Sequence, residues 1–177
     1  ISVITIWFFS KTLFGVNLSL LITLFFSTNL LFVSESHIAK TDSVLLATIC
    51  LQQYLLFLIF LNKESNIRFN YILPIIMWGV LSVGVLIKGP ISIIIFGLTL
   101  ISFSIVKKNI SIFLKTKPLI GLLVACIIIL PWFLIVQESS GGLFLQKSLG
   151  EDFIPKLISQ QEGHGAYPGF YILISSF

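Results

Sequence analysis

The stretch LIGLLVACIIILPWFLIV, residues 119–136, contains 18 consecutive residues without a charged side chain. A helix needs ~20 predominantly apolar residues to cross the ~30 Å hydrocarbon core of a bilayer, with about 17 as the lower limit. Inside lipid every backbone polar group needs an internal partner, and a helix supplies one within a single segment. Residues 119–136 therefore predict a membrane-spanning helix.

Apolar runs of the same kind alternate with short polar breaks along the rest of the chain. Partial spans are expected at 1–9 and 170–177, because both ends of the chain interrupt hydrophobic segments. We expect an all-α, polytopic transmembrane helix bundle, present here as an internal piece of a longer protein and as part of a single transmembrane domain. The lengths of the runs predict full spans near 16–33, 43–61, 71–87, 89–106 and 119–136.

The composition argues against a soluble domain and against a nucleic-acid-binding protein. Of the 177 residues, 56% are hydrophobic and 10% are charged. Soluble domains carry about 25% charged residues, so this chain has too few charges to cover a globule in water. The net charge of +4 comes from lysines and arginines scattered between apolar runs, without the basic face that nucleic acid requires.

The charges also predict which breaks lie on each side of the membrane, because short loops rich in Lys and Arg face the cytoplasm. One alternating set of breaks holds Lys11, Lys63, Arg68, Lys107, Lys108, Lys115 and Lys117. The other set spreads Lys40, Lys88, Lys147 and Lys156 over longer loops, and it contains Glu35, Asp42, Glu138, Glu151, Asp152 and Glu162. We expect this second set, with loops 34–42 and 137–167, to face outward, which is the periplasmic side if the cell is Gram-negative.

The long outer loop, 137–167, begins with the sequence SSGG at 139–142, which predicts a flexible break. Apolar residues then recur every four positions, with charged residues between them, at Leu145, Leu149, Phe153 and Leu157. This pattern favours one or two short helices that lie in the membrane interface. A soluble loop helix packed on the bundle is the alternative.

The first polar cluster that could carry chemistry lies in the break before the span at 43–61. Glu35, His37, Lys40 and Asp42 crowd about eight residues on the outer side. Asp42 opens the next helix, where a carboxylate suits both the N-cap geometry and the positive end of the helix dipole. Spacing alone leaves two alternatives open: a helix cap among solvated neighbours, or part of a functional site.

The second candidate is Lys88, which stands between two spans in the short turn Ile87-Lys88-Gly89-Pro90. A single ammonium at the membrane boundary either extends toward water or meets an anion, and a lipid phosphate is the obvious anion. The third candidate is the sequence QQEGHGAYPG at 160–169, in which Glu162 and His164 are two residues apart. One His and one Glu make a weak metal signal, and His can also bind phosphate.

These motifs resemble those of a known family in their order and spacing. They are HIAKTDSVLL at 37–46, IKGP at 87–90, ILPWFLIV at 129–136 and QEGHGAYPGFYIL at 161–173. The chain resembles the bacterial branch of the dolichyl-phosphate-mannose-protein mannosyltransferase family, which includes the aminoarabinose transferases that modify lipid A. The resemblance covers nearly the whole chain.

The resemblance implies a GT-C type fold with its active site at the outer face of the membrane. It implies transfer of a sugar from a polyprenyl phosphate to a lipid, protein or glycan acceptor. Asp42 is then expected to be catalytic, and the donor phosphate is expected to bind Lys88, Lys40 and His164. Glu35, His37 and Glu162 would support the loops around them. No cofactor is identified and no metal ligand is assigned, while a divalent metal stays an open alternative.

One feature of the family is missing from this stretch of sequence. The family's first outer loop carries an Asp-Glu pair, which would precede Ile1, so we expect this piece alone to be inactive. Two rival interpretations remain. A secondary transporter would place ionisable residues near the middle of the bilayer, and a non-functional remnant of a membrane protein would need no site at all.

Overall fold

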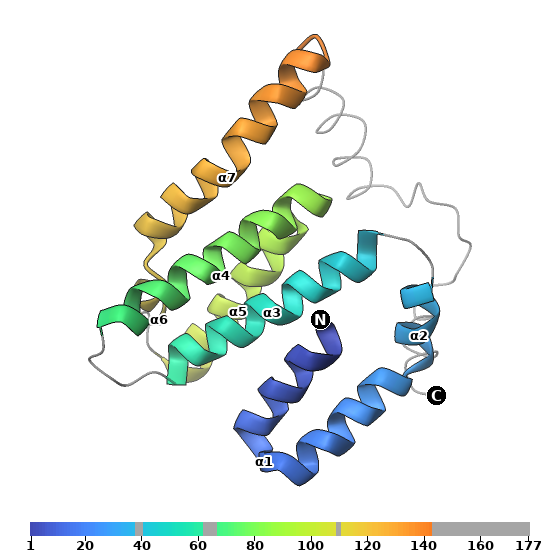
Figure 1. The fold of residues 1–177 in the computed structure, drawn as a ribbon. Helices are drawn as coiled ribbons and strands as arrows, with labels where there is room; N and C mark the ends of the chain where they lie inside the picture. Colours follow the sequence, from blue (N-terminus) through green and yellow to red (C-terminus); the bar gives the residue numbers. More distant parts are fainter. Residues whose placement is uncertain (38–40, 62–66, 109–110, 143–177) are drawn as a thin grey trace. The chain divides into compact units, whose positions relative to one another are not determined.

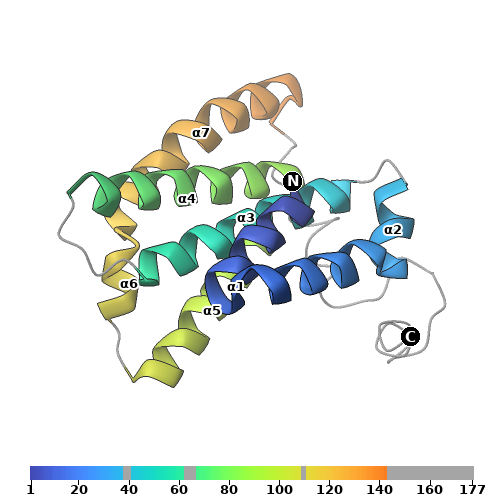
Figure 2. The ribbon, with the colours of Figure 1, turned by 60° about the horizontal axis from the view of Figure 1, so that its bottom comes forward.

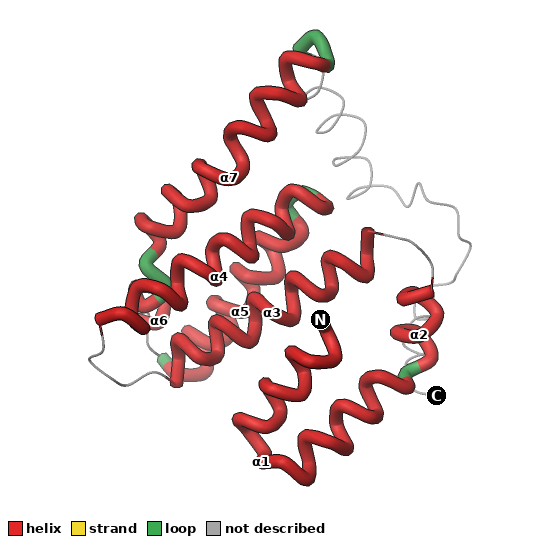
Figure 3. The backbone as a smooth tube through the Cα atoms, in the orientation of Figure 1, coloured by secondary structure: helices red, strands yellow, loops and turns green. Residues whose placement is uncertain are grey.

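The computed structural model describes residues 1–37, 41–61, 67–108 and 111–142. Within these residues every regular element is a helix, as Figure 3 shows. The elements are, in order, α1 (Ser2–Thr28), α2 (Leu30–His37), α3 (Thr41–Leu61), α4 (Ile67–Lys88), α5 (Ile91–Lys107), α6 (Ser111–Lys115) and α7 (Pro118–Ser139). The predicted all-α class is confirmed.

Four helices of the described part are long and apolar enough to cross a membrane. They are Ser2–Thr28, Thr41–Leu61, Asn70–Lys88 and Pro118–Ser139. The fifth apolar helix, Ile91–Lys107, has 17 residues and is therefore at the lower limit for a span. The predicted polytopic transmembrane bundle is confirmed, and the chain is an integral membrane protein.

The beginning of the chain differs from the expected pattern of a partial span at 1–9 and a full span at 16–33. Helix α1 contains nearly all of the first and most of the second, up to Thr28, but it bends sharply at Gly15 (Figure 1), whose φ is 80° and ψ −178°. This backbone region is open essentially to glycine alone. The helix then ends at Thr28, because the side-chain Oδ1 of Asn29 accepts hydrogen bonds from the backbone N–H groups of Leu31 (3.0 Å) and Phe32 (3.2 Å) and so begins α2.

Helix α2 also changes the expected loop 34–42. It continues to His37, so the first part of that stretch is helical and only a short connection separates α2 from α3. The polar pair Thr28-Asn29 is the physical reason, because Asn competes for backbone N–H groups and is among the best N-caps. A run that reads as one apolar segment is thereby divided into two helices.

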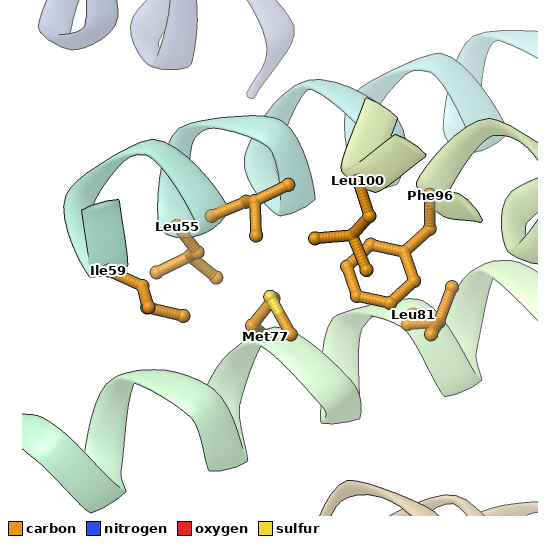
Figure 4. Close-up of a cluster of buried hydrophobic side chains, with 7 residues drawn as sticks. Leu55, Ile59, Met77, Leu81, Phe96 and Leu100 are labelled. Carbon is orange, nitrogen blue, oxygen red and sulfur yellow. The ribbon is translucent and has the colours of Figure 1, made fainter. Parts of the chain in front are cut away.

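Helices α3 and α4 lie side by side and run antiparallel, and α1 and α5 also contact α3 (Figures 1 and 2). Side chains from three helices converge between them to form the core (Figure 4). It consists of Leu55, Leu56, Ile59, Met77, Leu81, Phe96 and Leu100. In addition, the rings of Phe60 and Phe103 stack at 4.6 Å between centroids. This packing fixes α4 and α5 against α3, and with them the turn that joins α4 to α5.

Polar atoms and small residues supply the close contacts among these helices. Gln53 Nε2 of α3 donates a hydrogen bond to Thr99 Oγ1 of α5 (3.1 Å). Trp78 Nε1 of α4 donates to the backbone oxygen of Thr116 (2.8 Å). Gly121 of α7 lies so near the Trp78 ring that an added Cβ would come within 2.0 Å of it. Such contacts are characteristic of helix association in lipid, where apolar burial alone gives little driving force.

The chain divides into two compact units, Ile1–Ile129 and Leu130–Phe177, with the boundary inside α7. In the second unit α7 ends in a Schellman motif: the N–H of Gly142 donates to the oxygen of Gln137 (3.0 Å) and that of Gly141 to the oxygen of Glu138 (3.1 Å). The stretch 139–142, expected to be a flexible break, is therefore a hydrogen-bonded helix cap with a left-handed glycine, Gly141 (φ 62°). The expected interfacial helices at 145–157 and the partial span 170–177 lie outside the described residues.

Candidate functional site

The structure brings Asp42 and Lys88 together although they are 46 residues apart in the chain. The Nζ atom of Lys88 donates a hydrogen bond to Oδ1 of Asp42, and the two side chains form an ion pair. Asp42 lies in the first turn of α3 and Lys88 is the last residue of α4. Two of the three polar stretches singled out in the sequence therefore meet at one end of the α3–α4 pair.

The turn after Lys88 explains why its side chain lies at this end. Gly89 has a left-handed φ of 68°, and its N–H closes α4 with a hydrogen bond to the oxygen of Val85 (2.8 Å). Pro90 is the N-cap of α5, and its oxygen accepts the N–H of Ile94 (3.0 Å). Proline suits the start of a helix because the missing N–H would have no partner there. The sequence KGP thus ends one helix, reverses the chain and begins the next.

The helix dipoles favour both charges of the pair. A carboxylate near a helix N-terminus and an ammonium near a C-terminus each gain typically 0.3–1 kcal/mol. The side chains of Lys88 and Asp42 are 41% and 45% exposed, and an exposed pair is worth only about 0–1 kcal/mol. The pair is therefore held in place by the helices and not by its own strength, and either charge can bind another partner.

A pocket of about 550 Å³ lies next to the pair, and Asp42 belongs to its lining. It is formed by α1, α2 and the first turns of α3, with the residues Ile6, Ile22, Phe25, Phe26, Asn29, Leu31, Phe32, Asp42, Ser43 and Leu46. Most of the lining side chains are apolar, so the pocket is a hydrophobic surface with one carboxylate, that of Asp42, at its edge. Such a surface suits a ligand with a hydrocarbon part and a polar end.

The remaining candidates of the sequence have different outcomes. Glu35 and His37 belong to α2, which contacts α3, and the structure describes their backbone alone. Lys40, Glu162 and His164 lie outside the described residues. Within the part of the chain that the structure describes, no three His, Cys, Asp or Glu residues gather where they could hold a metal ion. The roles of all these residues stay predictions.

Two polar residues of the pocket, besides Asp42, were given no role from the sequence. Asn29 lines the pocket and caps α2, and Ser43 follows Asp42 in the pocket wall. A signal for Asn29 is present in the sequence, since an Asn inside a long apolar run predicts a helix N-cap. Ser43 carries no signal of its own, because its place depends on how α1 folds back beside α3.

Basic side chains from different segments of the chain lie at the two ends of α4. Lys88 is at its C-terminus, while near its N-terminus the Nζ of Lys117 lies 5.0 Å from the centre of the Tyr71 ring. Lys117 belongs to the basic set that the sequence assigns to one side, and Lys88 and Asp42 belong to the other set. Their separation at opposite ends of one helix agrees with the alternation on which that assignment depends.

Comparisons with known proteins place these features in a family. The family model described as dolichyl-phosphate-mannose-protein mannosyltransferase matches residues 1–135, which include Asp42, Lys88 and the helices that hold them. Neither the curated proteins nor the solved structures give a match. Because the family model covers most of the chain, the chain belongs to the dolichyl-phosphate-mannose-protein mannosyltransferase family and is a membrane glycosyltransferase of the GT-C type in general terms.

Proposed function

We propose that this chain is part of an enzyme that transfers a sugar from a polyprenyl-phosphate donor to a lipid, protein or glycan acceptor, at the outer face of a bacterial inner membrane. The observation that carries the proposal is the pairing of Asp42 with Lys88 at one end of α3 and α4. This end also borders an apolar pocket large enough for part of a lipid chain. A carboxylate, an ammonium and a greasy surface together match a donor with a phosphate and a prenyl tail.

The two charges suit opposite parts of a glycosyl transfer. The bond between the sugar C1 and the phosphate oxygen breaks, and polyprenyl phosphate leaves with the bonding electrons and an added negative charge. The Lys88 ammonium stabilises that charge. A new bond forms between C1 and the acceptor oxygen, and the acceptor's proton passes to the Asp42 carboxylate, which acts as general base. Atoms and charge balance with no further reactant.

The exposure of the pair permits this exchange of partners. Since 41% of the Lys88 side chain is exposed, a phosphate oxygen can approach Nζ while α4 stays in place. Lys40 and His164 are proposed as further phosphate ligands, with Glu35, His37 and Glu162 supporting their loops. Lipid A, the acceptor of the aminoarabinose transferases that the sequence motifs resemble, is one acceptor to test. The same transfer assay, run with and without added divalent metal, tests whether a metal ion acts near His164.

The arrangement of charges favours an enzyme at the interface over a transporter. In the described residues, Asp42, Lys88, Lys107 and Lys115 all lie in the first or last turn of a helix. Lys11 lies within α1 but four residues before the bend at Gly15. Transporters place their coupling residues near the bilayer midplane in broken helices, so the transporter stays the weaker candidate.

Sugar transfer by the full-length protein in vesicles, with defined polyprenyl-phosphate sugars, tests the proposal. We expect Lys88→Ala to raise the KM for the donor and lower kcat, reducing kcat/KM about 100-fold, as does the loss of one charge-stabilising group. Asp42→Asn is expected to lower kcat about 100-fold with little change in the KM for the donor, because a general base contributes 10²–10⁴-fold.

Matched control variants distinguish the proposed roles of Lys88 and Asp42 from the general effect of removing a charged side chain at a helix end. Lys107→Ala removes a lysine from the last turn of α5, as Lys88→Ala does from α4. Glu138→Gln neutralises an exposed carboxylate at the end of α7. Both controls should insert into the membrane and transfer sugar like the wild type. Wild-type rates in Lys88→Ala and Asp42→Asn vesicles would reject both role assignments.

A further inference from the structure

Gly84 of α4 lies close to both α3 and α5, beneath the Asp42–Lys88 pair. It is buried, and it lies four residues, or about one turn, before Lys88. A Cβ placed on Gly84 would lie 2.5 Å from Ser92 Oγ, 3.1 Å from Ser92 Cβ and 3.3 Å from Thr48 Oγ1. Ser92 belongs to α5 and Thr48 to α3, so even one methyl group would press on both neighbouring helices.

The neighbours of Gly84 have little room to yield. Ser92 is 1% exposed, and its hydroxyl has no hydrogen-bond partner among the described residues, so it is a tightly enclosed group. Thr48 Oγ1 donates to the backbone oxygen of Leu45 (2.7 Å), which fixes its rotamer. Rotation of the Ser92 hydroxyl would relieve the contact at 2.5 Å, but the contacts with Ser92 Cβ and Thr48 Oγ1 would remain.

We propose that Gly84 is a positioning residue, which sets how closely α4 approaches α3 and α5 and thereby holds Lys88 beside Asp42. Residues four apart on a helix lie above one another on the same face. A side chain at position 84 therefore pushes that face of α4 outward and carries Lys88 away from the first turn of α3. The geometric claim stands by itself, and its consequence for sugar transfer rests on the proposed function.

Two other glycines of α4 and α5 lack such a tight contact. Gly79 lies on the same helix, and a Cβ there would meet one atom, Ile128 Cδ1, at 4.0 Å. A Cβ on Gly97 of α5 would meet nothing within 4 Å. Both are glycines inside membrane helices, so Gly79→Ala and Gly97→Ala control for the general effect of replacing glycine in a helix.

Disulfide formation between positions 42 and 88 measures the geometry without reference to catalysis. The full-length protein carries Asp42→Cys and Lys88→Cys, with Cys50→Ala and Cys126→Ala, and oxidation is followed in membranes. Because a disulfide needs Cα atoms within about 7 Å and a narrow range of side-chain directions, the oxidation rate reports how often thermal motion brings the two cysteines together, and it falls as the helices separate. We expect Gly84→Val to slow oxidation about tenfold and Gly84→Ala to slow it less, while Gly79→Ala and Gly97→Ala leave it unchanged.

A second-site change makes the proposal falsifiable even where Gly84→Val folds poorly. Ser92→Gly removes two of the three contacts, so Gly84→Ala combined with Ser92→Gly should oxidise at the parent rate. In the protein with Asp42 and Lys88 intact, the same combination should restore the sugar transfer that Gly84→Ala reduces. Unchanged oxidation in Gly84→Val, or no restoration by Ser92→Gly, overturns the positioning role. A third outcome is also informative: Ser92→Gly restores oxidation, but substitutions at position 84 leave sugar transfer unchanged. That outcome supports the positioning role of Gly84 and counts against the proposed function.

Discussion

Helices α4 and α7 are alike in sequence character but differ in what they contact. Each has 22 residues and one internal proline, Pro74 or Pro131. In α4 the side chains of Pro74, Met77, Leu81 and Ser82 are buried. In the part of α7 that belongs to the first unit, residues 118–129, Gly121 alone is buried. Although α7 is the more apolar of the two helices, its first-unit part is less buried than α4.

This difference shows that hydrophobicity in a membrane protein does not indicate which residues meet other helices. Lipid tails are as apolar as a leucine side chain, so an apolar residue gains little by leaving lipid. Beside its apolar core residues Met77 and Leu81, α4 makes a close approach at Gly84, which faces Ser92 of α5 and Thr48 of α3. A close contact of α7 in the first unit likewise uses a glycine, Gly121, against the Trp78 ring.

The largest effect on stability is expected from emptying the core of α4. Met77 is 0% exposed, and Met77→Ala should lower the free energy of unfolding by about 2–3 kcal/mol, in the lower part of the range for buried large-to-small changes. The transfer term is small in lipid, so the cavity supplies most of the loss. Ile127 of α7 is 65% exposed, and Ile127→Ala should leave stability nearly unchanged. Equal losses at the two positions, measured by unfolding in mixed micelles, would remove the contrast between the helices.

The next effect concerns Gly121, where the first-unit part of α7 packs tightly. Gly121→Ala puts a methyl group about where the Trp78 ring lies, so the indole must move and lose its hydrogen bond to the Thr116 oxygen. We expect a loss of about 1–2 kcal/mol, within the range for overpacking. Leu122→Ala, at a residue 61% exposed, is the control. If Gly121→Ala unfolds like the wild type, α7 is held by something other than this contact.

Much of the fold follows from the sequence because charge and apolar length determine where helices can lie in a bilayer. The helices α3, α4 and α5 fall near the expected runs 43–61, 71–87 and 89–106. The first two helices do not follow the expected spans, because Gly15 and Asn29 act through backbone geometry and capping, which a count of apolar residues ignores. The same holds for the Schellman cap at 137–142, where two consecutive glycines end the helix by hydrogen bonds.

The sequence predicts the charged residues of the candidate site but not their pairing or the pocket beside them. Asp42 and Lys88 stand out because each is a charge at the end of an apolar run, and both were assigned to the same side. Their direct pairing requires that α3 and α4 be neighbours in antiparallel register, which depends on contacts such as those of Gly84. The pocket beside them could not be anticipated, because it exists only once α1 folds back at Gly15.

The smallest effect is expected from the hydrogen bond that joins α3 to α5. A double-mutant cycle of Gln53→Leu and Thr99→Val should give a coupling of about 0.6 kcal/mol, with ~1.7 kcal/mol as the highest value for interhelical hydrogen bonds in lipid. As a control, Thr12→Val of α1 removes an exposed hydroxyl that bonds its own helix at the Phe8 oxygen, and it should show no coupling to Gln53→Leu. A zero coupling between Gln53 and Thr99 would mean that this hydrogen bond does not stabilise the contact between α3 and α5. Close steric fit at glycine and serine residues would then be the feature that sets these helices apart from α7. A measurable coupling would show that polar atoms share that role, as expected where water is absent and each amide must find a partner inside the protein.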